Sequence, residues 1–177
     1  MKLVVRSFVL VIGLAILTVQ PARGAAYIKF DGITGESSYD SGSGWCDMTA
    51  FVQSLEKPGA TYSGRRGAVG APFEVEVTKA LDKASPKIAE ACVKSTITPF
   101  ATVEIRLLAQ IGGSQKVYLK IEMTNVIITS YSISGDADDR TTEEFSLNYE
   151  EIKVTYAQYD GTGGHMGNVD YTYDAIP

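Results

Sequence analysis

Residues 116–133 read KVYLKIEMTNVIITSYSI, and this stretch decides the fold class. In its first half the apolar side chains alternate with polar or amphipathic ones. The apolar members are Val117, Leu119, Ile121 and Met123. The second half continues in β-branched residues. A period of two with one polar face is the pattern of a half-buried strand, so the whole stretch predicts β structure.

Shorter segments repeat the same alternation. They are residues 26–30, 73–78 and 102–107. Gly112 and Gly113 separate the last of these from the long stretch, and paired glycines between two strands predict a tight hairpin. Residues 171–173 (YTY) read as a closing strand.

Residues 144–158 contain a change of phase. The apolar positions are odd at first (Phe145, Leu147 and Tyr149) and then even (Ile152, Val154 and Tyr156). One extra residue near positions 150–151 would return both sets to the same face, and this is what a β-bulge does. The segment therefore predicts a long strand that bends, as a curved sheet requires.

One helix is signalled after residue 84. Ser85 is predicted to cap it, and Pro86 suits its first turn, where a missing N–H costs nothing. Ile88, Ala91 and Cys92 then fall on one stripe, and the helix is expected to end near residues 93–94. The segments 34–44, 57–72 and 135–142 read as loops. Together these elements predict a single mainly antiparallel β domain with one short helix.

The first 24 residues have the layout of a secretory signal peptide. Lys2 and Arg6 precede the apolar run of residues 8–19, and Ala22-Arg23-Gly24 is a small-residue ending. The run is short of the roughly 20 residues of a spanning helix. A membrane anchor and a wrongly placed start codon are the alternatives. The sequence thus predicts a signal at 1–24, one domain at 25–177, and secretion by way of the periplasm. If residues 1–24 do not act as a signal, the expected place of assembly is the cytoplasm.

Charge narrows the classes of partner. Without residues 1–24 the chain keeps 13 basic and 21 acidic side chains, a net charge of −8. Such a balance opposes sequence-independent binding to nucleic acid and docking on anionic lipid. We therefore expect protein partners, with neither nucleic acid nor membrane bound by the mature form.

Cofactor and catalytic signals are missing. Cys46 and Cys92 have no zinc-motif spacing, and they are either two buried thiols or one disulfide. His165, the only histidine, lies in a Gly-rich stretch and is expected to be solvated. Asp136 and Asp138 alternate as calcium ligands do, but Arg140 takes the next ligand position, so a solvated turn is the better interpretation. We predict no cofactor, no metal and no enzymatic activity.

Several of these segments, in this order, resemble the Hcp family, the tube proteins of type VI secretion. Residues 27–37 resemble its first strand, ending in the turn Gly35-Glu36-Ser37. Residues 76–86 resemble its strand-to-helix junction, with Asp82, Lys83, Ser85 and Pro86 in the motif. Residues 118–135 and 143–156 are similar to its central and late strands. The resemblance spans residues 27–173.

The resemblance implies a closed antiparallel β-barrel of two sheets with one flanking α-helix, similar to phage tail-tube proteins. It further implies that six copies form a ring and that rings stack into a tube. Sheath, spike or effector proteins would then be partners. An extended loop would touch the neighbouring ring through Pro58, Gly59, Tyr62, Arg65, Arg66 and Gly70. The segment 46–54 would line the lumen through Asp47, Thr49, Phe51 and Gln53.

Two departures from the family leave an alternative function open. Gln53 and Ser54 stand where the family shows a Trp-Gly ending, and family members that assemble in the cytoplasm carry no signal peptide. The alternative to a ring subunit is an exported monomeric binding module that kept the barrel and lost assembly.

Overall fold

The computed structural model describes residues 24–41, 43–55, 72–94, 96, 98–137 and 139–175. Nine strands and one helix follow one another in the order β1 Ala25–Phe30, β2 Cys46–Met48, β3 Ala50–Leu55, β4 Pro72–Ala80, α1 Ser85–Val93, β5 Phe100–Ile111, β6 Ser114–Ser134, β7 Thr142–Asn148, β8 Glu151–Tyr159 and β9 His165–Asp174. Within this part of the chain, no helix has the length and apolar character needed to cross a membrane. The mainly β fold with one short helix is as predicted.

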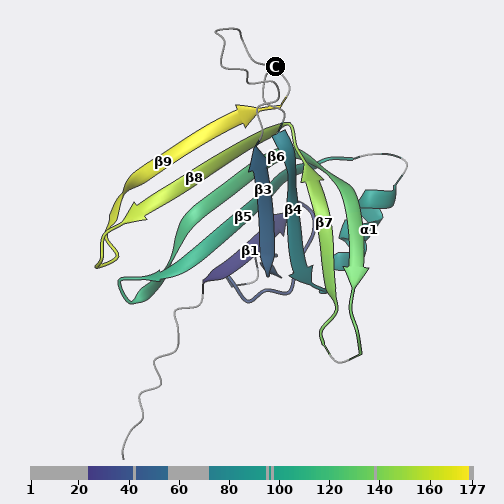
Figure 1. Ribbon diagram of the computed structural model, residues 1–177, viewed down its shortest axis with the longest axis horizontal. Coiled ribbons are helices and arrows are strands. Elements are labelled where there is room, and N and C mark those ends of the chain that lie inside the picture. The colour runs from purple at the N-terminus through teal and green to yellow at the C-terminus, as the bar shows by residue number, and fades with distance from the viewer. Residues whose placement is uncertain are drawn as a thin grey trace, which may run out of the picture.

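The strands form two antiparallel sheets that share β6 (Figure 1). Sheet A has the order β2-β1-β5-β6-β8-β9, and sheet B has the order β3-β4-β7-β6. The two sheets face each other across the core, and α1 lies beside sheet B. Apolar side chains from both sheets and Ile88 of α1 fill the space between them.

β6 passes from one sheet to the other at a corner. Residues before 126 pair with β5 and β8, and residues after it pair with β7. Asn125 at the corner has a φ of 48°, a left-handed conformation that asparagine tolerates better than most residues. Its side-chain amide donates a hydrogen bond to Glu150 Oε2 at 2.5 Å, which ties the corner to the neighbouring strand.

The predicted one-residue bulge near 150–151 is wrong. Asn148 pairs with Ile127, and Glu151 pairs with Thr124, so the same number of residues lies between these pairs on both strands. The phase change arises instead because the strand is interrupted at Tyr149–Glu150, opposite the corner in β6. The register shift between β6 and β7 lies elsewhere, between Ile128 and Ser130.

Strand pairing leaves the barrel open. Among the described residues the hydrogen-bonded path ends at β2 on one side and at β3 on the other. Only Thr49 separates these two strands, and its amide donates to Thr78 O of β4 at 2.9 Å. The chain itself therefore crosses from β1 to β4, but the pairings do not establish the fully closed barrel that the resemblance implies.

The helix has the predicted length but a different beginning. Ala84 occupies the N-cap without a side-chain cap, so Ser85 does not cap the helix as predicted. The Ser85 hydroxyl is instead drawn inward, where it accepts from the Asp82 amide at 2.9 Å and donates to Glu143 Oε1 at 2.9 Å. The helix ends at Val93, as expected from the sequence.

Two long hairpins extend in the same direction from the core (Figure 1). The β5–β6 turn is Gly112-Gly113, with φ of 59° and 81°, which confirms the predicted tight hairpin. A Cβ added at Gly112 would collide with the carbonyl of Thr162 in the β8–β9 turn. The two hairpin tips are therefore packed backbone to backbone, and a side chain at position 112 would separate them.

Candidate assembly surface

The inner face of sheet A consists of three parallel rows of side chains that cross five strands. The row at the corner end, called here the covered row, contains Phe30, Val103, Met123, Ile152 and Tyr173. The row nearest the hairpin tips, called here the open row, contains Ala26, Leu107, Leu119, Tyr156 and Val169. The middle row contains Ile28, Ile105, Ile121, Val154 and Tyr171.

Burial falls from the covered row to the open row. Met123 and Ile152 are fully buried, whereas Tyr156 is 49% exposed and Val169 is 70% exposed. Sheet B lies over the covered row, and its strand β3 reaches the middle row, where the Gln53 amide donates to the Tyr171 hydroxyl at 3.0 Å. Sheet A is therefore longer than the sheet that covers it.

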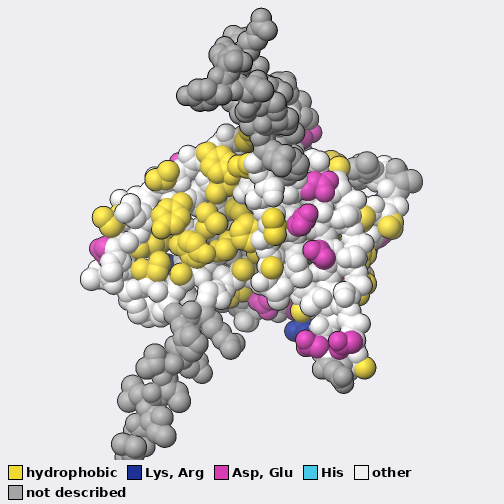
Figure 2. All heavy atoms as spheres, in the orientation of Figure 1, with side chains coloured by type: hydrophobic (Ala, Val, Ile, Leu, Met, Phe, Trp, Pro, Cys, Tyr) yellow, Lys and Arg dark blue, Asp and Glu magenta, His cyan; other side chains and the backbone are white. Residues whose placement is uncertain are grey.

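The uncovered end makes a broad apolar surface. Figure 2 shows hydrophobic side chains gathered over the region where β5, β6, β8 and β9 extend in Figure 1. Its exposed members include Tyr171 of the middle row, which is 40% exposed. β9 also pairs only with β8 among the described strands, so its other edge is unpaired. Exposed apolar patches next to a long unpaired edge are characteristic of surfaces that another protein covers.

The opposite face of sheet A is charged. Glu104 accepts from Arg106 at 2.7 Å, and Lys120 pairs with Glu122 at 2.9 Å. Arg106 is partly covered there, because its guanidinium lies 4.6 Å from the centre of the Trp45 ring and donates to the Tyr39 hydroxyl at 3.2 Å, whereas Lys120 and Glu122 are more exposed. The same strands are therefore apolar on their inner face and charged on their outer face.

The residues of the predicted family motif hold the fold together. A Cβ at Gly35 would collide with the carbonyl of Trp45, so only glycine fits there. Glu36 Oε1 accepts from the Lys83 amide at 3.1 Å, which joins the two halves of the motif. The Ser37 hydroxyl donates to Asp47 Oδ1 at 2.7 Å and fixes the loop to β2.

The second half of the motif surrounds a buried ion pair. Lys79, with a fully buried side chain, lies 2.6 Å from Glu143 Oε1 and 2.8 Å from Asp82 Oδ1. The Tyr131 hydroxyl donates to the other oxygen of Glu143 at 2.6 Å. Ser85 completes the cluster, and Pro86 occupies the first turn of α1.

Electrostatics in this cluster favour the charged forms of Lys79 and Asp82 and the neutral form of Tyr131. Burial alone would lower the pKa of Lys79, but its hydrogen bonds and its attraction to Asp82 and Glu143 outweigh burial and raise that pKa. Burial likewise opposes the charge on Asp82, yet Lys79 holds the pKa of Asp82 below its ordinary value. Burial and the bond to Glu143 raise the pKa of Tyr131. Every charge is paired, which is the arrangement of a structural cluster.

Sequence reasoning did not single out Lys79 and Glu143, although a signal was present. Lys79 continues the inward-facing alternation of Val75 and Val77, and Glu143 begins that of Phe145 and Leu147. Opposite charges at inward positions of two strands indicate a buried pair. The structure places these two residues directly opposite each other in neighbouring strands.

The residues predicted to line a lumen lie along β2, Thr49 and β3. Thr49 contacts β4, Phe51 packs against the core, and Gln53 points to Tyr171. Asp47 belongs to the Ser37 loop. The loop residues Pro58, Gly59, Tyr62, Arg65, Arg66 and Gly70 lie outside the described residues.

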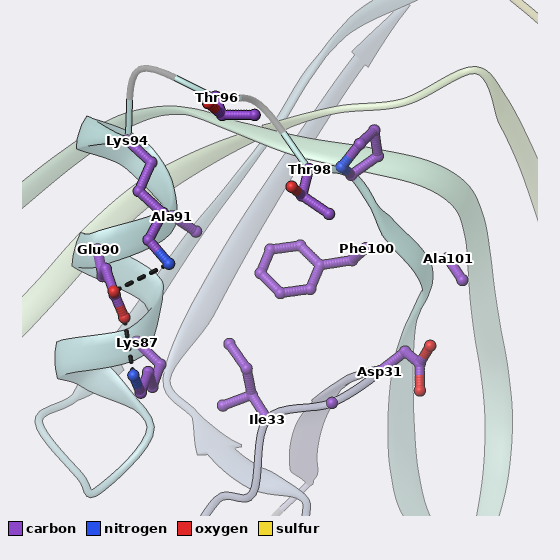
Figure 3. A pocket seen from close by; sticks show the side chains of 12 residues that line it. Asp31, Ile33, Lys87, Glu90, Ala91, Lys94, Thr96, Thr98, Phe100 and Ala101 are labelled. Carbon is purple, nitrogen blue, oxygen red and sulfur yellow. Dashed lines mark hydrogen bonds and ion pairs between the residues drawn. The ribbon is translucent and has the colours of Figure 1, made fainter.

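Two other candidate sites lie within the described residues. A groove of about 500 Å³ lies between α1 and the start of β5, with Phe100 and Ile33 inside it (Figure 3). Its charged members on the helix pair with one another, since Glu90 forms ion pairs with both Lys87 and Lys94. His165 lies in β9 and not in a loop as predicted, and its ring contacts Asn168 Oδ1 at 2.7 Å.

The described part of the chain contains neither a group of metal ligands nor a disulfide. No cluster of three or more His, Cys, Asp or Glu side chains there could hold a metal ion. Asp138 lies outside the described residues. Both thiols are free, with Cys46 buried and Cys92 half-buried. Burial raises the pKa of the Cys46 thiol to about 12 and keeps it unreactive.

Comparison with known proteins agrees with this geometry. The family model described as type VI secretion system effector, Hcp, matches residues 27–156. Protein hcp1 of Pseudomonas aeruginosa is 32% identical over 96 residues, which cover 53% of this chain and 57% of that protein. The matched part thus spans little more than half of that relative.

Solved structures extend the similarity over the whole fold. A structure described as a type six secretion system protein has 28% identity and a TM-score of 0.77, covering 87% of this chain and 97% of its own. Hcp1 from Salmonella typhimurium has 21% identity and a TM-score of 0.70, covering 85% and 94%. Because the family model matches most of the sequence and these folds agree, the chain belongs to the Hcp family of type VI secretion proteins.

Proposed function

We propose that this protein is a structural subunit whose copies bind one another through the open row, form a six-membered ring and stack into a tube. It acts without enzymatic activity or cofactor. Its partners are other copies of itself, with sheath, spike or effector proteins around or inside the tube. The observation that carries this proposal is the uncovered end of the inner face of sheet A.

The exposed apolar area supports association between identical copies. Tyr156, Val169 and Tyr171 lie side by side on β8 and β9, and removing apolar surface from water contributes about 25 cal/mol per Å². A second copy covers this surface with a different surface of its own, because contact between two identical patches would stop at a dimer. A contact of this head-to-tail kind that closes on itself produces a ring.

Finer features of the family belong to the same proposal. Closure of the barrel is part of the proposal, and the amide of Thr49, which donates to Thr78 O where the chain crosses between the sheets, supports it. The charged face of sheet A, which carries Arg106 and Lys120, is the surface that would face a water-filled lumen. Residues 1–24 would direct export, so that assembly takes place beyond the inner membrane.

Native mass spectrometry of purified residues 25–177, together with electron microscopy of the same sample, tests the proposal. We expect hexamers and rings. Val169→Glu should reduce the assembly to monomers, because it places a charge in the open row. Thr172→Glu is the matched control, since it adds the same charge to the opposite face of the same strand and should leave assembly intact.

Two results would overturn the proposal. One is a protein that stays monomeric at high concentration, which would favour the exported binding module. The other is a Val169→Glu variant that assembles as well as the unchanged protein. Circular dichroism of each variant establishes that it is folded.

A further inference from the structure

We propose that a second copy covers the open row with the face around α1, where a groove runs between the helix and the start of β5. This inference rests on the proposed function, in which the open row is one half of the contact between copies and the other half is unassigned. Three properties of the described residues support it: where the two surfaces lie, which apolar side chains they expose and what charge they carry.

The two surfaces lie on opposite sides of the molecule. In Figure 1 the β8–β9 hairpin, which carries the exposed residues Tyr156 and Val169 of the open row, extends to one side of the core, and α1 lies at the other side. When two different surfaces on opposite sides bind each other, each added copy presents a new free surface, and addition stops only when the ring closes. The placement of α1 therefore suits a head-to-tail contact with the open row.

The face around α1 offers apolar side chains that its own fold leaves partly uncovered. Ile33 and Phe100 point into the groove beside the helix, and both are half-buried (Figure 3). Val93, the last residue of α1, is 81% exposed. A contact that brings Tyr156 and Val169 of another copy over this face would remove apolar surface from water on both partners.

The charges of the two surfaces are opposite. Residues 83–94, which contain α1, carry three lysines and one glutamate, a net charge of +2. The β8–β9 hairpin, residues 151–174, carries four acidic side chains and one lysine, a net charge of −3 with His165 neutral. Since residues 25–177 as a whole carry −8, the helix is a locally basic surface on an acidic domain. Opposite charges at the edge of a contact steer the partners together and fix their orientation.

The strand β3 is a second surface with exposed apolar side chains, Val52 and Leu55, but it suits the open row less well. Val52 pairs with Glu76 of β4, and Glu144 of β7 lies on the same outer face of sheet B. An acidic face would repel the acidic β8–β9 hairpin, because like charges brought together across an interface are unfavourable. Charge therefore favours the face around α1 over the outer face of sheet B.

Photo-cross-linking in the assembled protein tests this inference. The probe p-benzoylphenylalanine is placed at position 169 of residues 25–177, which contain every described strand and α1. Copies labelled with ¹⁵N are mixed with unlabelled copies, so that mass spectrometry distinguishes cross-links between copies from those within one copy. We expect cross-links from position 169 to α1 or to the start of β5 of a second copy. The same probe at position 172, on the opposite face of β9, is the control and should give none there.

A charge reversal on the helix is the second test. Lys87 and Lys94 are exposed, so Lys87→Glu combined with Lys94→Glu should leave the core intact, which circular dichroism and thermal unfolding establish. We expect this variant to need an about tenfold higher concentration to assemble, because it turns attraction into repulsion. Lys116→Glu combined with Lys120→Glu is the matched control, since it changes the net charge equally on the outer face of sheet A. Light scattering should find its assembly concentration within about threefold of the unchanged protein.

The outcomes separate this inference from the proposed function. Cross-links from position 169 to β3 or to the open row of a second copy would overturn the inference, while the open row would stand as a contact between copies. Unchanged assembly of the helix variant would overturn it as well. If residues 25–177 do not assemble at any concentration, the proposed function fails and this inference fails with it.

Discussion

The covered row and the open row of sheet A lie on the same five strands and have the same apolar character, yet on β6, β8 and β9 the open row is the more exposed of the two. Val103 in the covered row is 1% exposed, whereas Val169 in the open row is 70% exposed. The difference arises because sheet B ends before sheet A does. The comparison teaches that alternation in a sequence indicates which face of a strand is apolar, while the partner that covers this face depends on distant segments or on another molecule.

The largest effect is expected at the buried ion pair of sheet B, between Lys79 in β4 and Glu143 in β7. Lys79→Met should lower the free energy of unfolding by about 3–5 kcal/mol, because it leaves Glu143 buried without its partner. Adding Glu143→Leu to the same protein should recover a large part of that loss. Urea denaturation measures both, and a single variant within about 0.5 kcal/mol of the unchanged protein would contradict the assignment.

A pair of identical substitutions tests the comparison itself. Val103→Ala should lower the free energy of unfolding by about 2 kcal/mol, because two buried methyl groups are lost and a cavity is left. Val169→Ala should change it by less than about 0.5 kcal/mol in the monomer. Thermal unfolding at low protein concentration measures the difference, and equal losses would show that the open row is buried within its own chain.

Packing between the two hairpin tips is the next feature to test, because these tips join the strands that carry the open row. Gly112→Ala should cost about 1–2 kcal/mol, because its φ is left-handed and its Cβ would collide with the carbonyl of Thr162. Gly161→Ala is the control, with open space around its added Cβ. Stability is read from urea denaturation, and an equal response of both variants would argue against packing between the tips.

The smallest of these effects is expected in acid, which should weaken the ion pair between Asp82 and Lys79. The pKa of Asp82 is lower in the folded state than in the unfolded state, so its contribution is present at neutral pH and is lost as the pH falls through the folded value. Stability should therefore decline below about pH 4. Asp82→Asn should flatten this part of the stability profile, measured by urea denaturation between pH 2.5 and 6. An unchanged profile would show that Asp82 is not the group that titrates.

Much of the fold could be predicted because local patterns encode it. The alternation of residues 116–133, the glycine pair at 112–113 and the extent of α1 all depend on near neighbours, and the structure confirms them. The change near residue 150 is an interruption of the strand and not the predicted bulge, because it lies opposite the corner in β6 at Asn125. Ser85 was misread for a similar reason: Glu143, 58 residues away, takes the hydroxyl that would have capped the helix.

The candidate site was harder to predict than the fold. The open row becomes visible only when the registers of five strands are known, because each strand contributes one residue to it. The alternation predicts that the members of the open row point inward. It does not show that no other strand packs over them. The extended loop, which was the predicted assembly region, lies outside the described residues and remains a prediction.

The central claim is that the open row is the surface through which copies of this protein meet. Hydrogen exchange of residues 25–177, followed as the protein concentration rises, tests it directly. We predict that β8 and β9 exchange more slowly as association proceeds, while the strand segment around Val103 keeps its rate. Association that leaves β8 and β9 unprotected would contradict the account.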